Sequence, residues 1–285
     1  MKVNSRQHYV PQFYLRGWSE DRDSIWAYPI EGVAPFATSV ANVACEKGLY
    51  SHPSTDNIYP LRTEQIMAKI EGHYSLVWPN IWDRASAADT RKNLARFVAL
   101  MALRHPEREN QIRRLNSSFR SAVSGMSPDE VVEVRSHGES ASCTVAELRD
   151  GTKDGKEMIK STFLRHLPDL IQDLAEVLVQ RKWGIVFSER PAFVTSDSPM
   201  VLHRGTATKQ SIGYGTAGTQ ILFPISPTRL LAICDDWPHA FAHYKLANLD
   251  IFNCILARAA TRFVFFQNND SQLATNILAW RSPKK

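Results

Sequence analysis

The sequence contains few cysteines and no long apolar run. Its four cysteines, Cys45, Cys143, Cys234 and Cys254, are far apart, which excludes the paired spacing of zinc-binding cysteines. No secretory n-region followed by an h-region opens the chain. We therefore expect buried thiols in a reducing, cytoplasmic compartment. Because no apolar segment approaches the roughly 20 residues that span a bilayer, we expect no membrane partner.

The sequence also has little excess charge. Lys and Arg number 34 against 29 Asp and Glu, a net charge of +5 over 285 residues. This balance permits nucleic acid or another phosphate-bearing ligand as a partner without requiring one. A hydrophobic share of 44% is typical of a globular protein.

The first half of the chain is mainly helical in pattern. Residues 24–30 alternate like a strand, and Pro29 within them predicts a sheet edge. Apolar residues at helical spacing then predict helices over about 63–81, 90–119 and 159–178. The second of these is expected to turn Leu115 and Phe119 inward and to be kinked or divided at Pro106.

The second half is mainly strand in pattern, after an exposed insertion predicted at about 124–156, where Ser, Gly, Asp and Glu dominate. The expected elements are hairpins at 184–195 and 220–233, a helix at about 236–259 and a strand at 262–266. No regular βαβ alternation is present. The sequence therefore predicts an α+β fold, with a helical N-terminal half packed on a mainly antiparallel C-terminal sheet.

Arg104 lies on the apolar stripe of a predicted helix, three residues after Met101 and seven after Phe97. A guanidinium there must find partners, because an unpaired buried charge is costly. Two interpretations are open. Pro106 distorts the helix and lets Arg104 extend to solvent, or Arg104 clamps an anion or orients a catalytic carboxylate.

Asp197 directly follows a predicted strand, within the segment Thr-Ser-Asp-Ser-Pro at 195–199. Polar side chains at strand ends often face a cleft. A carboxylate in such a position binds a divalent metal or acts as a general base. The alternative is an Asx-turn, in which Asp197 bonds its own downstream backbone.

His8 and Glu71 complete the set of candidate site residues. His8 precedes an aromatic and apolar run through Trp18, which is expected to tie the N-terminal segment into the core and fix the ring. It serves as a metal ligand or general base, or as a structural histidine. Glu71 lies at the edge of a helical stripe, facing either solvent or a cleft.

Three short motifs indicate a function less strongly than these candidate residues do. The G-x-G-x-x-G letters at 213–218 precede a strand pattern, whereas a dinucleotide site needs a helix there, so a flexible loop or lid is expected. His239 and His243 share one face of a predicted helix and could chelate a metal, but no carboxylate stands where a zinc protease needs it. His8-x-Val10-Pro11 partly matches His-Asn-His nucleases without their ββα-metal unit.

Several blocks of sequence occur in a familiar order: residues 8–15, 70–72, 94–106, 193–199, 223–227 and 253–266. Together they resemble the bacterial and phage-associated family catalogued as a domain of unknown function, number four-two-three-eight. Ser198 stands where Asn is common in that family, and His105 where Thr is common. The resemblance covers nearly the whole chain and implies one domain over residues 1–285. It implies no established activity.

Two functional hypotheses follow. In the first, the protein is a metal-dependent phosphodiester hydrolase of the nuclease type. Asp197, Glu71 and His8 then hold Mg²⁺ or Mn²⁺, and Arg104 stabilises charge in the transition state. In the alternative, the protein is a non-enzymatic binding or sensing protein. His8, Arg104 and Asp197 then form a buried network that fixes the N-terminal segment onto the sheet.

Overall fold

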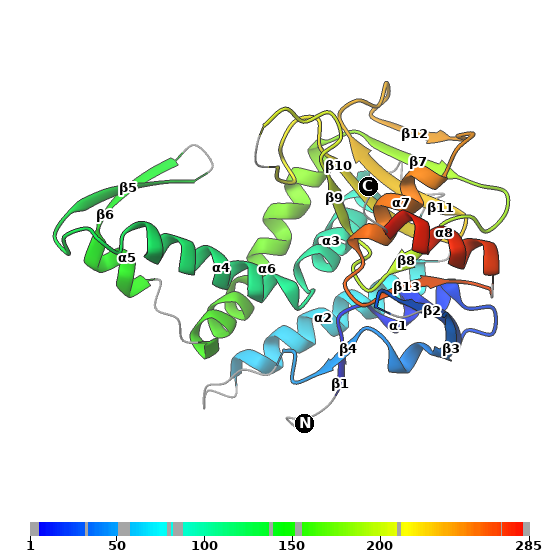
Figure 1. Ribbon diagram of the computed structural model, residues 1–285, viewed down its shortest axis with the longest axis horizontal. Coiled ribbons are helices and arrows are strands. Elements are labelled where there is room, and N and C mark those ends of the chain that lie inside the picture. Colours follow the sequence, from blue (N-terminus) through cyan, green and yellow to red (C-terminus); the bar gives the residue numbers. More distant parts are fainter. Residues whose placement is uncertain are drawn as a thin grey trace. The chain divides into compact units, whose positions relative to one another are not determined.

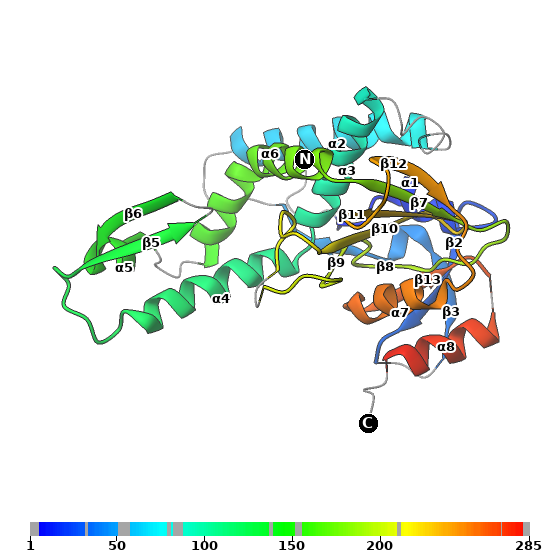
Figure 2. The same ribbon diagram turned by 90° about the horizontal axis from the view of Figure 1, so that it is seen from above.

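A computed structural model describes residues 6–31, 34–50, 58–78, 81, 88–136, 139–151, 156–209, 212–268 and 270–281 (Figures 1 and 2). The chain forms two compact units. Unit 1 comprises Met1–Leu49, Glu64–His105 and Pro168–Lys285, and unit 2 comprises Tyr50–Thr63 and Pro106–Leu167. The fold is α+β with mostly antiparallel sheets, as predicted. The long helices lie in the middle of the chain rather than throughout its N-terminal half.

Unit 1 begins with a two-stranded sheet. Strand β1 (Arg6–His8) pairs antiparallel with β4 (Cys45–Lys47), so that His8 lies opposite Cys45. The chain then forms α1 (Gln12–Leu15) and the short helix η1 (Arg16–Trp18). Tyr14, Leu15 and Trp18 are fully buried. The aromatic run thus fixes the N-terminal segment in the core, as expected from its composition.

A four-stranded sheet brings distant segments together in the order β3-β2-β13-β8. Its strands are β2 (Ser24–Pro29), β3 (Phe36–Ser39), β8 (Thr195–Ser196) and β13 (Phe263–Phe266). The prediction that residues 24–30 form an edge strand is wrong, because β2 pairs with β3 on one side and β13 on the other. Pro29 is tolerated as the last residue of β2, beyond the residues that pair with β3.

A five-stranded sheet has the order β12-β7-β11-β10-β9. Its strands are β7 (Trp183–Phe187), β9 (Val201–His203), β10 (Gln220–Ser226), β11 (Arg229–Cys234) and β12 (Phe241–Tyr244). The β10–β11 hairpin confirms one prediction. The hairpin predicted at 184–195 is wrong, because β7 pairs with β11 and β12 while Thr195 pairs with Phe265.

Helices complete unit 1. They are η2 (Val40–Asn42), most of α2 (Ile58–Val77), α3 (Ala88–Leu103), the end of α6 (Lys156–Gln180), α7 (Asp250–Ala259) and α8 (Ser271–Arg281). The helix predicted at about 236–259 is wrong over its first half, where β12 forms. Helices α7 and α8 pack together (Figure 2). Their apolar residues share a core with both large sheets through Leu222, Leu256, Val264 and Ile277.

Unit 2 contains α4 (Glu107–Ala122), β5 (Val131–Ser136), β6 (Glu139–Thr144), α5 (Val145–Gly151) and the first part of α6. Pro106 separates α3 from α4, as predicted. The described part of the predicted insertion at 124–156 holds the β5–β6 hairpin and α5, and most of its residues are exposed. Leu115 and Phe119 were expected to face inward, yet they are 59% and 43% exposed.

Candidate functional site

His8 stands at the end of β1 with its ring partly buried. Burial lowers the pKa of His8, and a hydrogen bond to the backbone of Ala41 acts in the opposite direction. The Nε2 atom is buried and has no hydrogen-bond partner among the described residues. A ring that donates from its other nitrogen to a carbonyl carries its lone pair on Nε2. His8 therefore presents an unpaired ring nitrogen in a partly buried position, and burial favours the neutral form of the ring.

Arg104 follows the last residue of α3 and is only 3% exposed. Its Nη1 donates to Oε1 of Glu71 over 2.7 Å. Its Nη2 donates to the backbone carbonyl of His8. The interpretation in which Arg104 extends to solvent is therefore wrong. The guanidinium joins helix α2 to strand β1 through an ion pair with Glu71, and the role of that carboxylate in catalysis stays a prediction.

Glu71 lies on α2 at the boundary between the interior and solvent. Its side chain is 30% exposed while its carboxylate is paired with the buried Arg104. Glu71 raises the pKa of His8 electrostatically and Arg104 lowers it, both by less than the effect of burial. The structure thus brings His8, Glu71 and Arg104 together from three elements of unit 1.

Asp197 is fully buried directly after β8. Its Oδ1 accepts a hydrogen bond from Thr261 N at 2.9 Å, and its Oδ2 accepts from Thr261 Oγ1 at 2.6 Å and Arg262 N at 2.7 Å. Both oxygens therefore hold the turn that leads into β13. An Asx-turn on its own downstream backbone does not form, because the residue two positions on is Pro199, which has no N–H, and both carboxylate oxygens bond residues 261 and 262 instead.

The Asp197 turn connects to the N-terminal segment through residues that the sequence did not single out. Thr261 Oγ1 lies 3.4 Å from Nε2 of His105. The His105 ring contacts the edge of Tyr9, with centroids 5.1 Å apart. Tyr9 is buried, and burial raises its pKa well above the ordinary value. Tyr9 and His105 adjoin predicted residues in sequence, whereas no local signal indicates Thr261.

The chemical capacity of this site differs among its residues. His8 offers a free nitrogen and Glu71 a partly exposed carboxylate. Arg104 and Asp197 are engaged in holding other groups in place. In the part of the chain that the structure describes, no three His, Cys, Asp or Glu side chains are grouped to hold a metal ion. Metal-ligand roles for Asp197, Glu71 and His8 stay predictions.

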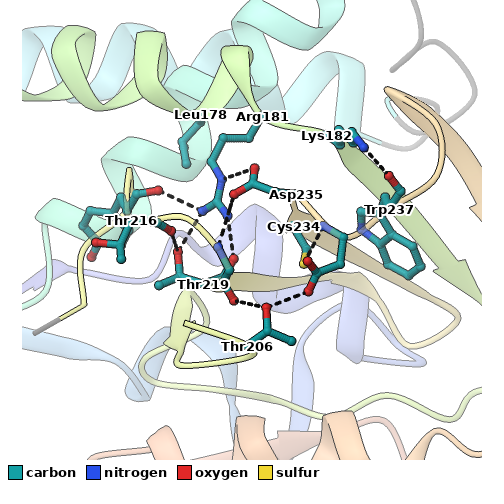
Figure 3. A network of polar contacts seen from close by, with 12 residues as sticks. Leu178, Arg181, Lys182, Thr206, Thr216, Thr219, Cys234, Asp235 and Trp237 are labelled. Carbon is teal, nitrogen blue, oxygen red and sulfur yellow. Dashed lines mark hydrogen bonds and ion pairs between the residues drawn. The ribbon is translucent and has the colours of Figure 1, made fainter. Parts of the chain in front are cut away.

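A second buried arginine organises a separate network in unit 1 (Figure 3). Arg181, 7% exposed, donates from Nε and Nη2 to the two oxygens of Asp235 over 3.0 and 2.9 Å. It also donates to the carbonyl of Tyr214 and to Thr219. The hydrogen bond from Arg181 lowers the pKa of Asp235. The glycine-rich segment predicted to be a flexible loop is therefore held at both ends by one guanidinium.

The sequence contains a signal for Arg181 as well. Arg181 follows the stripe residues Leu174 and Leu178 at seven and three positions, the same relation that singled out Arg104. His239 and His243 do not share a helix face, because His243 lies in strand β12 and His239 precedes it.

The comparisons with known proteins identify one matching family. A family model described as "Protein of unknown function (DUF4238)" matches residues 6–270. The search of curated proteins and the search of solved structures gave no match. In the described part of the chain, no helix has the length and apolar character needed to cross a membrane. Because the match covers most of its length, the chain belongs to the DUF4238 family.

Proposed function

We propose that the protein is a metal-dependent phosphodiester hydrolase whose reactive centre contains His8 and Glu71. The observation that carries the proposal is the Nε2 atom of His8, which is buried without a hydrogen-bond partner in the described structure. A buried polar atom of this kind calls for an explanation, and a ligand or substrate proton is one. Burial also lowers the pKa of His8, which favours the neutral ring needed for either role.

Mg²⁺ or Mn²⁺ fits this pair of donors. Imidazole nitrogen and carboxylate oxygen are ligands that Mn²⁺ accepts, and Mg²⁺ is commonly held by one or two protein groups with water and substrate phosphate completing the shell. The hydrogen bond between the His8 ring and the backbone of Ala41 resembles the contacts that orient metal-binding histidines. Such an ion would lower the pKa of a bound water.

In this proposal Arg104 and Asp197 hold neighbouring groups of the centre in place. Arg104 holds both the Glu71 carboxylate and the backbone of His8, so it positions the two reactive groups relative to each other. Asp197 fixes the turn at Thr261, which adjoins His105. We therefore assign Asp197 a positioning role within the proposal, in place of the ligand role expected from the sequence.

The test is cleavage of bis(p-nitrophenyl) phosphate and of labelled single- and double-stranded DNA and RNA, with Mg²⁺, Mn²⁺ or EDTA. His8→Asn and Glu71→Gln should each reduce the rate on the order of hundredfold or more. The matched controls, His166→Asn and Glu20→Gln, change exposed residues of the same types and should cleave like the wild type. Cleavage that survives both site variants contradicts the proposal, as does no cleavage with any substrate and metal.

A second candidate is a non-enzymatic binding or sensing protein. It is favoured by the burial of Arg104 and Asp197, whose polar atoms hold backbone groups of distant segments. In that case His8→Asn and Glu71→Gln should lower the free energy of unfolding, as breaking a structural network does. An active-site role predicts little loss of stability, or a gain, for His8→Asn, with activity abolished. Glu71→Gln unpairs the buried Arg104 and lowers the free energy of unfolding in either case, so the stability of His8→Asn is the deciding value. Urea unfolding of the same four variants separates the two.

A further inference from the structure

A cavity of about 160 Å³ in unit 1 is lined mainly by apolar side chains. The buried Leu222 of β10 and Ala232 and Cys234 of β11 belong to its lining. Phe252 of α7 and Trp237, both partly exposed, add aromatic walls. An engineered apolar cavity of about 150 Å³ is known to take up benzene. The cavity therefore has room for one six-membered ring.

The Trp237 wall is held in place by three contacts. Its Nε1 donates to the carbonyl of Ala232 over 2.8 Å. Its ring stacks on Tyr244 of β12, with centroids 4.1 Å apart and planes 12° from parallel. Gly184 of β7 lies directly against the ring, so that a Cβ there would stand 2.6 Å from it. A wall fixed in this way needs no ordering when a ligand binds, which favours affinity.

The polar side of the cavity carries a carboxylate. Asp236 belongs to the lining, and its Oδ2 accepts a hydrogen bond from Thr206 Oγ1 at 3.0 Å. Its backbone N–H donates to Sγ of Cys234 over 3.4 Å. Gln220 is the other polar residue of the lining, and no Lys or Arg is among the described residues that line it. A carboxylate beside aromatic faces favours a cation.

We propose that this cavity binds a small organic amine that carries one apolar ring and one ammonium group. The ring lies between Trp237 and Phe252, over Leu222. The ammonium group donates to the Asp236 carboxylate at the open side. None of these residues belongs to the His8 site, so this inference stands independently of the proposed hydrolase activity.

Three probes with the same ring and different charge test the proposal: phenethylamine, 2-phenylethanol and phenylacetate. Binding is measured by isothermal titration calorimetry and by ligand-observed NMR on the full chain. Phenethylamine should bind saturably and about 1.5- to fivefold more tightly than the alcohol, the range expected for an exposed ion pair. Phenylacetate should bind most weakly, because its charge is repelled by Asp236.

Two variants locate the site. Asp236→Asn, at an exposed position, should reduce phenethylamine affinity to that of the alcohol and leave the alcohol unchanged; Asp250→Asn on α7 is the charge-matched control. Gly184→Ala should weaken the binding of phenethylamine and of 2-phenylethanol, because the added methyl group displaces the Trp237 ring. Near-ultraviolet circular dichroism reports the displacement of the ring. Equal affinity for all three probes, or an amine preference that Asp236→Asn does not alter, overturns the proposal. So does no saturable binding at millimolar concentration, and the Asp236 comparison holds even if Gly184→Ala does not fold.

Discussion

The turn held by Asp197 gives a graded prediction for stability. Its carboxylate is fully buried and accepts hydrogen bonds from two backbone N–H groups and one hydroxyl. Asp197→Ala removes all three and leaves both N–H groups without a protein acceptor. Hydrogen bonds to a charged group contribute about 1.5–3 kcal/mol each, and water at the exposed residues 261 and 262 offsets part of the loss. The expected loss is therefore about 3–5 kcal/mol of unfolding free energy, similar to breaking a buried pair.

Two milder changes complete the series. In Asp197→Asn, the carbonyl oxygen can replace Oδ2, but the amide NH₂ then faces the Thr261 N–H, so one bond is lost at a cost of about 1–3 kcal/mol. Thr261→Val removes the hydroxyl bond to Oδ2 and the longer contact with His105 Nε2 but keeps both backbone donors, at about 1 kcal/mol. The predicted order of destabilisation is Thr261→Val, then Asp197→Asn, then Asp197→Ala.

The assay is urea unfolding at pH 7, with amide hydrogen exchange of Thr261 and Arg262 as a local measure. Asp173→Asn is the control, an exposed carboxylate of unit 1 that should change stability by no more than about 0.5 kcal/mol. The reasoning is refuted if Asp197→Ala stays within that range, or if exchange at 261–262 does not accelerate. A loss of cleavage without a loss of stability would instead place Asp197 in the reactive centre.

Two further predictions concern His8 and Arg181. Because burial lowers the pKa of His8, the neutral ring contributes stability that is present above its ordinary pKa and is lost as pH falls through the lowered one. In EDTA and below pH 6.5, the unfolding free energy of the wild type should fall by up to about 1.4 kcal/mol per pH unit more than that of His8→Asn. Urea unfolding at a series of pH values measures this difference. Parallel profiles of unfolding free energy against pH would contradict the prediction. Arg181→Met should cost on the order of 3 kcal/mol and expose the 213–219 segment to limited proteolysis, whereas an unchanged cleavage pattern would show that other contacts hold the segment.

The sequence predicted the polar site better than the sheets around it. Arg104 could be found because a guanidinium on an apolar stripe must be paired, a local rule of helix geometry. Its partner Glu71 is 33 residues away, and its place at the edge of a helical stripe does not indicate that the two side chains pair. The hydrogen bonds of Asp197 depend on the pairing of β8 with β13, and no local pattern specifies which strands become neighbours. For the same reason, β2 was misplaced at an edge.

The predicted helix boundaries were wrong where the apolar pattern was ambiguous. Residues 236–249 combine charged and aromatic residues that suit a helix in isolation, yet Phe241–Tyr244 pairs with β7 as a parallel strand. Tertiary pairing overrides local propensity in such segments. In α4 the helix was predicted correctly, but the helical pattern did not establish that the apolar side chains of Leu115 and Phe119 are buried.

The pairing of β2 with β13 has a consequence for how the chain is made. Trp26 in the first tenth of the sequence finds its partner Phe266 only near the other end, and Tyr14 donates its hydroxyl proton to the carbonyl of Pro224. During synthesis, the aromatic N-terminal run can contact Trp78 and Phe97 early, but its contacts with residues 223 and 224 form only after most of the polypeptide exists. Such non-local contacts slow folding and prolong the exposure of apolar surface. A nascent chain stopped before residue 263 would lack β13, the inner strand that joins β2 to β8, and would leave the apolar edge of β2 without its partner. We therefore expect the risk of aggregation to be highest while the chain is being synthesised.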